Sequence, residues 1–211
     1  MQTEILQPDS ALAIQRAVEV LHAGGVVAFP TDTVYGLGVL PLDNDHIEKL
    51  YHIKGRDPLK SIPLLLPHSQ ALNTVAGDIG KIAPRLAEAF WPGPLTLILP
   101  RNPALPSLLS QTDTIGVRVP NHPVALRLLR LTGPLAVTSA NLSGQESCCT
   151  ASQVLDQLAG HFPLLLDGGR TPGSLASTVV DCTGREPVIL RQGPITLKQI
   201  KSVLALDPDR P

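Results

Sequence analysis

The sequence predicts an α/β protein built on a twisted mixed sheet with helices packed on it. Short apolar runs alternate with segments of helical periodicity along the 211 residues. Apolar residues make up 43% of the chain, which is enough to form a packed core. The 21 prolines are spread along the chain, where they separate elements. Tight connections between the later strands favour a mixed rather than a purely parallel sheet.

Each helix is predicted where apolar residues recur every three or four positions after a residue that can cap a helix. Asp9 or Ser10 can cap the first helix, Asp43 the second and Asp78 the third. These signals predict helices over residues 11–22, from about 44, from Asp78 to about 90, over 122–131, over 152–158 and from Thr196. Short apolar runs predict strands over 26–29, 62–66, 95–99, 115–119, 135–137, 164–166, 178–181 and 188–191.

The composition predicts a single-domain protein and argues against a membrane protein. We expect one domain over residues 1–206 and a tail over 207–211. The formal net charge is −1 and aromatic residues make up only 3%, so any anion site must be a local cluster of cations. Three cysteines without a CxxC pair, and no leader, favour a cytoplasmic protein with reduced thiols. The longest apolar runs are strand-sized, which argues against a membrane protein, and the scattered histidines predict no metal site.

A polar loop is predicted directly after the first buried strand, where residues 30–38 read PTDTVYGLG. Ligands of open α/β sheets bind outside the carboxyl ends of the strands, so this loop lies where a site is expected. Its glycine spacing matches neither a Walker loop nor GxGxxG. A well-made turn and a binding loop both remain open.

Four cations stand out by their surroundings. Lys54, Arg56 and Lys60 follow the end of a predicted helix, where they form either a solvated charged face or a phosphate clamp. Arg118 alternates with apolar residues in a predicted strand. A buried guanidinium needs a partner, which is either a carboxylate of this chain or the carboxylate of a substrate. The position at a strand end favours the substrate.

Short polar side chains follow another strand at residues 138–144, TSANLSG. No histidine is near in sequence to activate Ser139, and the GxSxG elbow is missing, so the segment is a binding loop or an Asn-Ser-Gly turn rather than a covalent centre. Ser177 and Arg191 stand at the ends of later strands. They either complete the site or only mark element boundaries.

Taken together, six segments resemble the YrdC-like family, which contains the threonylcarbamoyl-AMP synthases. They are PTDTVYGLG at 30–38, KxR at 54–56, TIGVRVP at 114–120, SANLSG at 139–144, STVVD at 177–181 and LRQGP at 190–194. They stand in the order of the family across most of the chain. The resemblance implies a short form with a single YrdC-like domain and a concave cationic site.

The resemblance also implies an activity and the residues that carry it. Members of the family make threonylcarbamoyl-AMP and pyrophosphate from L-threonine, bicarbonate and ATP, and a tRNA threonylcarbamoyl transferase then uses the product. L-Threonine would be held by Thr33, Arg118, Ser139 and Ser177. ATP would be held by Lys54, Arg56, Lys60, Thr114, Asn141 and Arg191. Lys54, Arg56 and Arg118 would be catalytic, and Mg²⁺ would arrive on the triphosphate, with no permanent cofactor.

Two departures from the family and one alternative function remain. Ala176 stands where a glutamate usually precedes the Ser-Thr pair, and Lys60-Ser61 replaces a frequent asparagine-proline. Asp32 is the one acidic residue of the motif loops expected to contact a metal or an amine indirectly. The alternative is an RNA-binding or ribosome-associated protein on the same fold, whose concave cationic surface would contact a duplex backbone.

Overall fold

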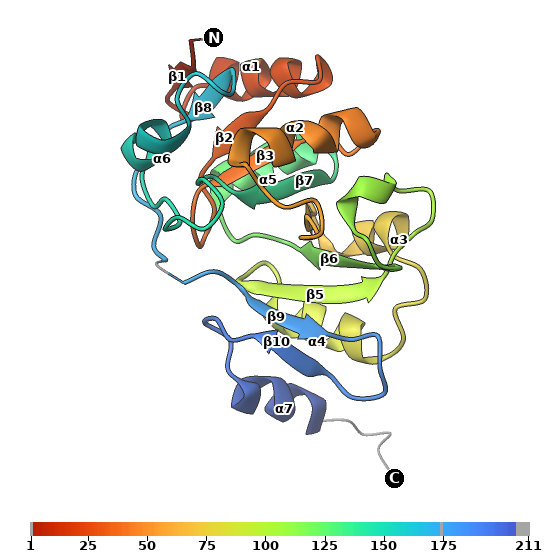
Figure 1. Cartoon of the computed structure of the whole chain (residues 1–211). Coiled ribbons are helices and arrows are strands. Elements are labelled where there is room, and N and C mark those ends of the chain that lie inside the picture. Colours follow the sequence, from red (N-terminus) through yellow and green to blue (C-terminus); the bar gives the residue numbers. More distant parts are fainter. Residues whose placement is uncertain (1, 174, 206–211) are drawn as a thin grey trace.

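The computed structural model describes residues 2–173 and 175–205 and shows one mixed sheet of ten strands. The strand order is β1-β8-β2-β3-β7-β4-β6-β5-β9-β10, and the sheet extends along the molecule from β1 to β10 (Figure 1). The α/β class and the mixed sheet predicted from the sequence are confirmed.

The strands are β1 Glu4–Leu6, β2 Val27–Phe29, β3 Gly36–Val39, β4 Leu64–Leu65, β5 Leu95–Pro100, β6 Thr114–Arg118, β7 Leu135–Ser139, β8 Leu164–Leu166, β9 Thr178–Asp181 and β10 Val188–Arg191. The helices are α1 Ala11–His22, α2 Asn44–Lys54, α3 Leu72–Val75, α4 Ile82–Phe90, α5 Pro123–Thr132, α6 Ala151–Leu158 and α7 Leu197–Ala205. Short 3-10 turns precede α3 and β6, at Ser69–Ala71 and Ser107–Leu109.

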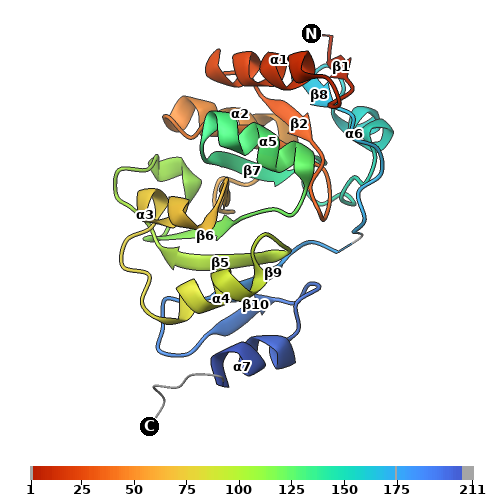
Figure 2. The ribbon, with the colours of Figure 1, turned by 180° about the vertical axis from the view of Figure 1, so that it is seen from behind.

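Helices cover both faces of the sheet. Successive residues of β2 point to opposite faces, so Val27 and Phe29 pack under α1 and α5, while Ala28 joins the larger cluster under α2 and α6. Figure 1 shows α2 and α6 in front of the sheet, and Figure 2 shows α1, α5 and α4 from the opposite side. At the other end of the sheet, α4 packs against β5 and α7.

Two of the three predicted helix caps are confirmed, and one is wrong. Ser10 Oγ accepts from Leu12 N–H at the start of α1, and Asp43 Oδ1 accepts from His46 N–H at the start of α2. The prediction that Asp78 caps the third helix is wrong. Asp78 Oδ1 accepts from Gly80 N–H in a turn, and α4 begins only at Ile82. This local side-chain bond competes with the helix for the same residues.

Two strands were not predicted, β1 and β3. The start of β3 belongs to the segment over 30–38 that was predicted to be a loop. Each glycine of β3 stands where a neighbouring strand packs closely. A Cβ on Gly36 would lie 2.7 Å from Val137 Cγ1, and one on Gly38 would lie 2.9 Å from Phe29 Cε1. β1 was not predicted because it is a short, mostly exposed strand at the edge of the sheet and has no buried apolar run.

The strand order brings polar residues from distant parts of the sequence to one place. Leu65 pairs with Arg118 of β6 and with Leu135 at the start of β7, while Gly36 pairs with Ser139 at the end of β7. β9 runs parallel to β5 and β5 runs antiparallel to β6, so Ser177, just before β9, lies near the end of β6. The loop between β2 and β3 completes the group.

Among residues 2–173 and 175–205, no helix combines the length and apolar character that crossing a membrane requires. The predicted tail over 207–211 lies outside the described residues.

Gly193 allows the segment after β10 to approach the start of β9, and replacing it tests that contact. A Cβ there would lie 2.4 Å from both Ala176 O and Thr178 N, which are backbone atoms that cannot swing aside. We expect Gly193→Ala to lower the free energy of unfolding by roughly 1–3 kcal/mol in urea titrations. Gly184→Ala is the matched control, because its Cβ would meet only Glu186 O at 3.7 Å. Equal stabilities of the two variants would contradict this packing.

Candidate active site

A cavity of about 330 Å³ is lined by residues of strands β3 to β7, β9 and β10 and of the loops beside them. Six of the ten residues predicted for the site line it: Thr33, Arg56, Arg118, Ser139, Ser177 and Arg191. The other four, Lys54, Lys60, Thr114 and Asn141, do not line it. The structure therefore gathers the core of the predicted set, while the roles assigned to the residues stay predictions.

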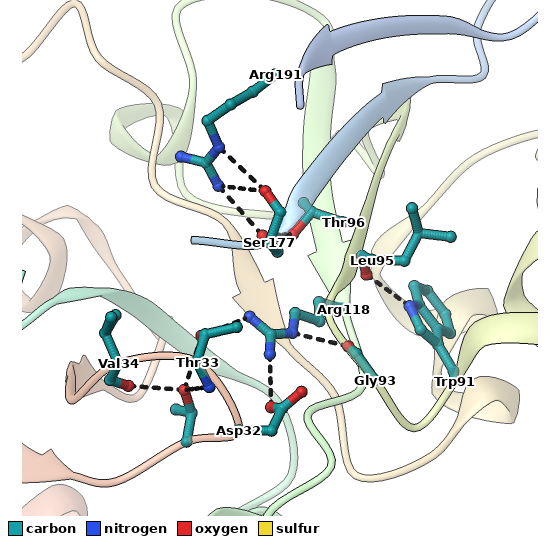
Figure 3. A network of polar contacts seen from close by, with 11 residues as sticks. Asp32, Thr33, Val34, Trp91, Gly93, Leu95, Thr96, Arg118, Ser177 and Arg191 are labelled. Carbon is teal, nitrogen blue, oxygen red and sulfur yellow. Dashed lines mark hydrogen bonds and ion pairs between the residues drawn. The ribbon is translucent and has the colours of Figure 1, made fainter. Parts of the chain in front are cut away.

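Arg118 is the most deeply buried cation of the cavity wall, with 7% of its side chain exposed. Its Nε donates to Gly93 O at 2.9 Å, its Nη1 to Thr33 Oγ1 at 3.1 Å and its Nη2 to Asp32 Oδ1 at 2.5 Å (Figure 3). Burial lowers the pKa of Arg118, and the charge of Asp32 opposes that shift. Since an arginine titrates far above neutrality, the side chain stays cationic.

One of the two partners considered for Arg118 is present in the structure. Its guanidinium pairs with a carboxylate of this chain, Asp32, because the loop after β2 folds over the end of β6. Asp32 thus neutralises this arginine, and its expected indirect contact with a metal or an amine stays a prediction. Its Oδ2 is buried without a hydrogen-bond partner among the described residues.

Two threonines orient the side of this network that faces the cavity. Thr31 Oγ1 donates to Val34 O at 2.7 Å and lies 3.0 Å from Thr33 Oγ1. A hydroxyl has one hydrogen, so Thr33 donates to Thr31 and accepts from Arg118. The loop is therefore a fixed surface of oriented hydroxyl groups.

Arg191 and Ser177 form a second polar group on the opposite wall, shown above Arg118 in Figure 3. Arg191 Nε and Nη2 donate to Ser177 O at 3.1 and 3.0 Å, and Ser177 Oγ lies 2.8 Å from Thr96 Oγ1. Burial lowers the pKa of Arg191, and repulsion from Arg118 lowers it further. The two arginines are thus close enough to act on one anionic ligand.

Arg56 belongs to the loop after α2 and shapes it. Its Nε and Nη2 donate to the carbonyl oxygens of Lys60 and Ser61 at 3.2 and 3.0 Å. Burial lowers the pKa of Arg56. The side chain of Lys60 is exposed outside the cavity.

Thr114 is connected to the cavity through a chain of hydroxyl groups. Ser61, which lines the cavity, lies 3.0 Å from Ser110, Ser110 lies 3.0 Å from Thr112, and Thr112 lies 2.8 Å from Thr114, all between hydroxyl oxygens. Thr114 begins β6 and Arg118 ends it, so the two residues stand about 13 Å apart along the strand. A site that extended over this distance along β6 would have room for two ligands side by side.

Lys54 was predicted to hold ATP, and the structure places it outside the lining of the cavity. Only 2% of Lys54 is exposed, and its Nζ donates to the carbonyl oxygens of Ser139 and Asn141. The reason is its place on α2, where it continues the buried stripe formed by Ile47, Leu50 and Tyr51. Its ammonium group therefore lies behind the cavity wall.

Several cavity residues were not predicted. Thr31, Ser61, Thr96 and Ser147 all line the cavity. Thr96 had a usable signal, because it is a polar residue among the apolar residues of β5, as Arg118 is in β6. Ser147 had none, since it follows a plain polar turn.

The lining favours binding of anions over covalent catalysis. Three arginines line the cavity, and none of its described lining residues is a histidine, cysteine or lysine. Among residues 2–173 and 175–205, no group of three His, Cys, Asp or Glu is placed to hold a metal ion. Fixed guanidinium groups suit carboxylate and phosphate ligands.

Comparison with known proteins gives the class to which this fold and site belong. The family model of the Sua5, YciO and YrdC proteins, described as "Telomere recombination", matches residues 19–193. The chain belongs to this family.

Two curated relatives are threonylcarbamoyl-AMP synthases. The one from Pyrococcus abyssi is 38% identical over 193 residues, which cover 90% of this chain and 57% of the relative. The one from Bacillus subtilis is 41% identical over 194 residues, which cover 90% of this chain and 56% of the relative. The chain thus spans little more than half the length of these relatives.

A solved structure of P. abyssi Sua5 complexed with L-threonine superposes with a TM-score of 0.91 at 36% identity. The match covers 96% of this chain and 61% of that one. The YrdC-like fold inferred from the six segments is confirmed.

The ion pair between Asp32 and Arg118 can be measured by a double-mutant cycle. We expect Asp32→Asn and Arg118→Gln each to lower the free energy of unfolding by about 3 kcal/mol, because each leaves a buried charge without its partner. The double variant should lose about 1–3 kcal/mol less than the sum of the single losses. The fluorescence of Trp91, the one tryptophan of the chain, reports the urea transition. Additive losses would show that the pair is not coupled.

Proposed function

We propose that this chain makes threonylcarbamoyl-AMP and pyrophosphate from L-threonine, bicarbonate and ATP. The observation that carries the proposal is the buried Arg118, oriented by Asp32, Thr33 and Gly93 in a cavity that two more arginines line. Membership of the family and the threonine complex of a relative support the same activity.

The reaction brings several anions together, and the cavity supplies the opposing charge. The amine of threonine adds to carbon dioxide derived from bicarbonate, which creates an N-carboxylate beside the α-carboxylate. This carbamate then attacks the α-phosphorus of ATP, and pyrophosphate leaves. Repulsion between the reactants opposes that approach. Fixed cations reduce the repulsion and stabilise the charge that develops on the leaving group.

Arg118 is suited to hold the α-carboxylate of threonine. A guanidinium has five N–H groups, and the contacts to Gly93, Thr33 and Asp32 use three of them. Two N–H groups are left for a ligand. Thr33, Ser139 and Ser177 line the same cavity and would contact the amine and hydroxyl groups.

Arg56 and Arg191 are suited to hold phosphate groups. Both line the cavity, Arg56 as a half-buried side chain and Arg191 as an exposed one. The hydroxyl chain from Ser61 to Thr114 would extend the nucleotide site along β6, with Lys60 at its exposed rim. Asn141 braces its own loop, because its Nδ2 donates to Leu142 O and Gln145 O.

The proposed mechanism needs order and charge more than a reactive side chain. Three reactants must be held together, and fixing them removes much of the entropic part of the barrier. Mg²⁺ would enter as part of the ATP substrate, held by phosphate oxygens and water. The activated product would pass to a tRNA threonylcarbamoyl transferase, and we expect the activity in the cytoplasm.

Omission of single substrates tests the proposed activity. Pyrophosphate release from MgATP should require both L-threonine and bicarbonate, because neither alone forms the carbamate that attacks ATP. A coupled phosphate assay measures it, with threonylcarbamoyl-AMP identified by mass spectrometry. Absence of release from folded protein would refute the proposal and turn attention to RNA binding, which falls steeply as salt is added.

The two arginine roles are separable by binding measurements. We expect Arg118→Ala to weaken L-threonine binding at least about tenfold with a smaller effect on ATP, since it removes a bidentate charge-assisted contact. Arg56→Ala should do the reverse. Isothermal titration with each ligand gives both constants. Equal losses for both ligands in both variants, with folding intact, would contradict the assigned roles.

A further inference from the structure

Lys54 is a buried charge that the mechanism above leaves without a task. Its ammonium group forms no ion pair with any acidic residue among those described. Three oxygens of one segment accept from it instead, namely Ser139 O, Asn141 O and, at 3.5 Å, Asn141 Oδ1. An ammonium group has three N–H donors, so these oxygens match its capacity.

The peptide group of each accepting carbonyl also donates a hydrogen bond through its own N–H. The peptide of the Ser139 carbonyl carries Ala140 N–H, which donates to Tyr35 O at 2.8 Å. The peptide of the Asn141 carbonyl carries Leu142 N–H, which donates to Gln157 Oε1 at 2.9 Å. Hydrogen bonds in such chains strengthen one another. Lys54 thus anchors the segment over 139–142 to β3 and to α6.

The ammonium group supplies donors that this segment needs. An apolar side chain of similar length would avoid the penalty of removing an ammonium group from water, but it would leave the carbonyl oxygens of Ser139 and Asn141 without this donor. Burial lowers the pKa of Lys54 to about 8, repulsion by Arg56 adds to the shift, and the Cys148 thiol opposes it. These two groups, from the loop after α2 and from the segment before α6, are the charged or titratable neighbours that act on it.

We propose that Lys54 is a positioning residue, whose ammonium group holds the backbone of residues 139–142 in place for both substrates. Ser139 lines the same cavity as Arg118, and Asn141 braces the loop that follows β7. The proposal rests on the proposed function for the identity of the two ligands, but the ordering of the backbone does not depend on it.

The proposal differs in its consequences from a phosphate-binding lysine. A phosphate ligand would affect ATP binding alone, and its loss would leave the backbone of residues 139–142 unchanged. Loss of a positioning lysine weakens the binding of both ligands and lowers the hydrogen-exchange protection of the amides of Ala140 and Leu142.

The test compares Lys54→Met with Lys49→Met in the full chain. Lys49 lies on the same helix, is exposed, and its Nζ donates to Gly24 O at 2.6 Å, away from the cavity. Hydrogen exchange at Ala140 and Leu142 reports the segment, and amides of α1 report overall folding. We expect at least about tenfold faster exchange at both positions in Lys54→Met, with no change in Lys49→Met. Lys54→Arg, which keeps the charge and the donors, should restore part of the protection.

Ligand titrations complete the test with L-threonine and a non-hydrolysable ATP analogue. Lys54→Met should raise both dissociation constants roughly tenfold, because displacement of binding groups by a fraction of an ångström is enough. Unchanged exchange at 140 and 142, or loss of nucleotide binding alone, would overturn the proposal. If the wild-type chain binds neither ligand, the proposed function fails, while the exchange data still decide the role of Lys54.

Discussion

A buried guanidinium at the end of a central strand is the constraint on which the site depends. Arg118 leaves water only because Asp32, Thr33 and Gly93 receive its N–H groups. These partners come from the loop after β2 and the turn before β5, so one side chain joins three segments that are distant in the sequence. The polar walls of the cavity are therefore part of the folded framework and not flexible additions to it.

The rest of the site follows from the need to keep cations close together. Arg191 is held by Ser177, Arg56 by the carbonyls of its own loop, and Lys54 by the carbonyls behind Ser139. Backbone oxygens satisfy the donors of these three cations without cancelling their charge, unlike Asp32 at Arg118. Three arginines line the cavity, and this suits the anionic reactants of the proposed condensation of a carbamate with ATP.

Local patterns predicted most elements but could not predict how residues pair across the fold. Periodicity located the helices that bury one face, and the glycines of β3 misled because their tight contacts with Val137 and Phe29 arise only after folding. The Asp32–Arg118 pair likewise joins residues far apart in the sequence. For Lys54 the information was present, since its spacing from Ile47 and Leu50 places it on the buried face of α2. This signal was overlooked because a lysine at the end of a helix is usually exposed.

A crystal structure of the chain with L-threonine and a non-hydrolysable ATP analogue tests the account most directly. The α-carboxylate of threonine should accept from the two free N–H groups of Arg118, while Arg118 keeps its contacts to Asp32 and Gly93. The account also predicts phosphates on Arg56 and Arg191, and the Nζ of Lys54 still on the carbonyls of Ser139 and Asn141. A carboxylate bound away from Arg118, or an Arg118 that releases Asp32 to bind it, would contradict the account.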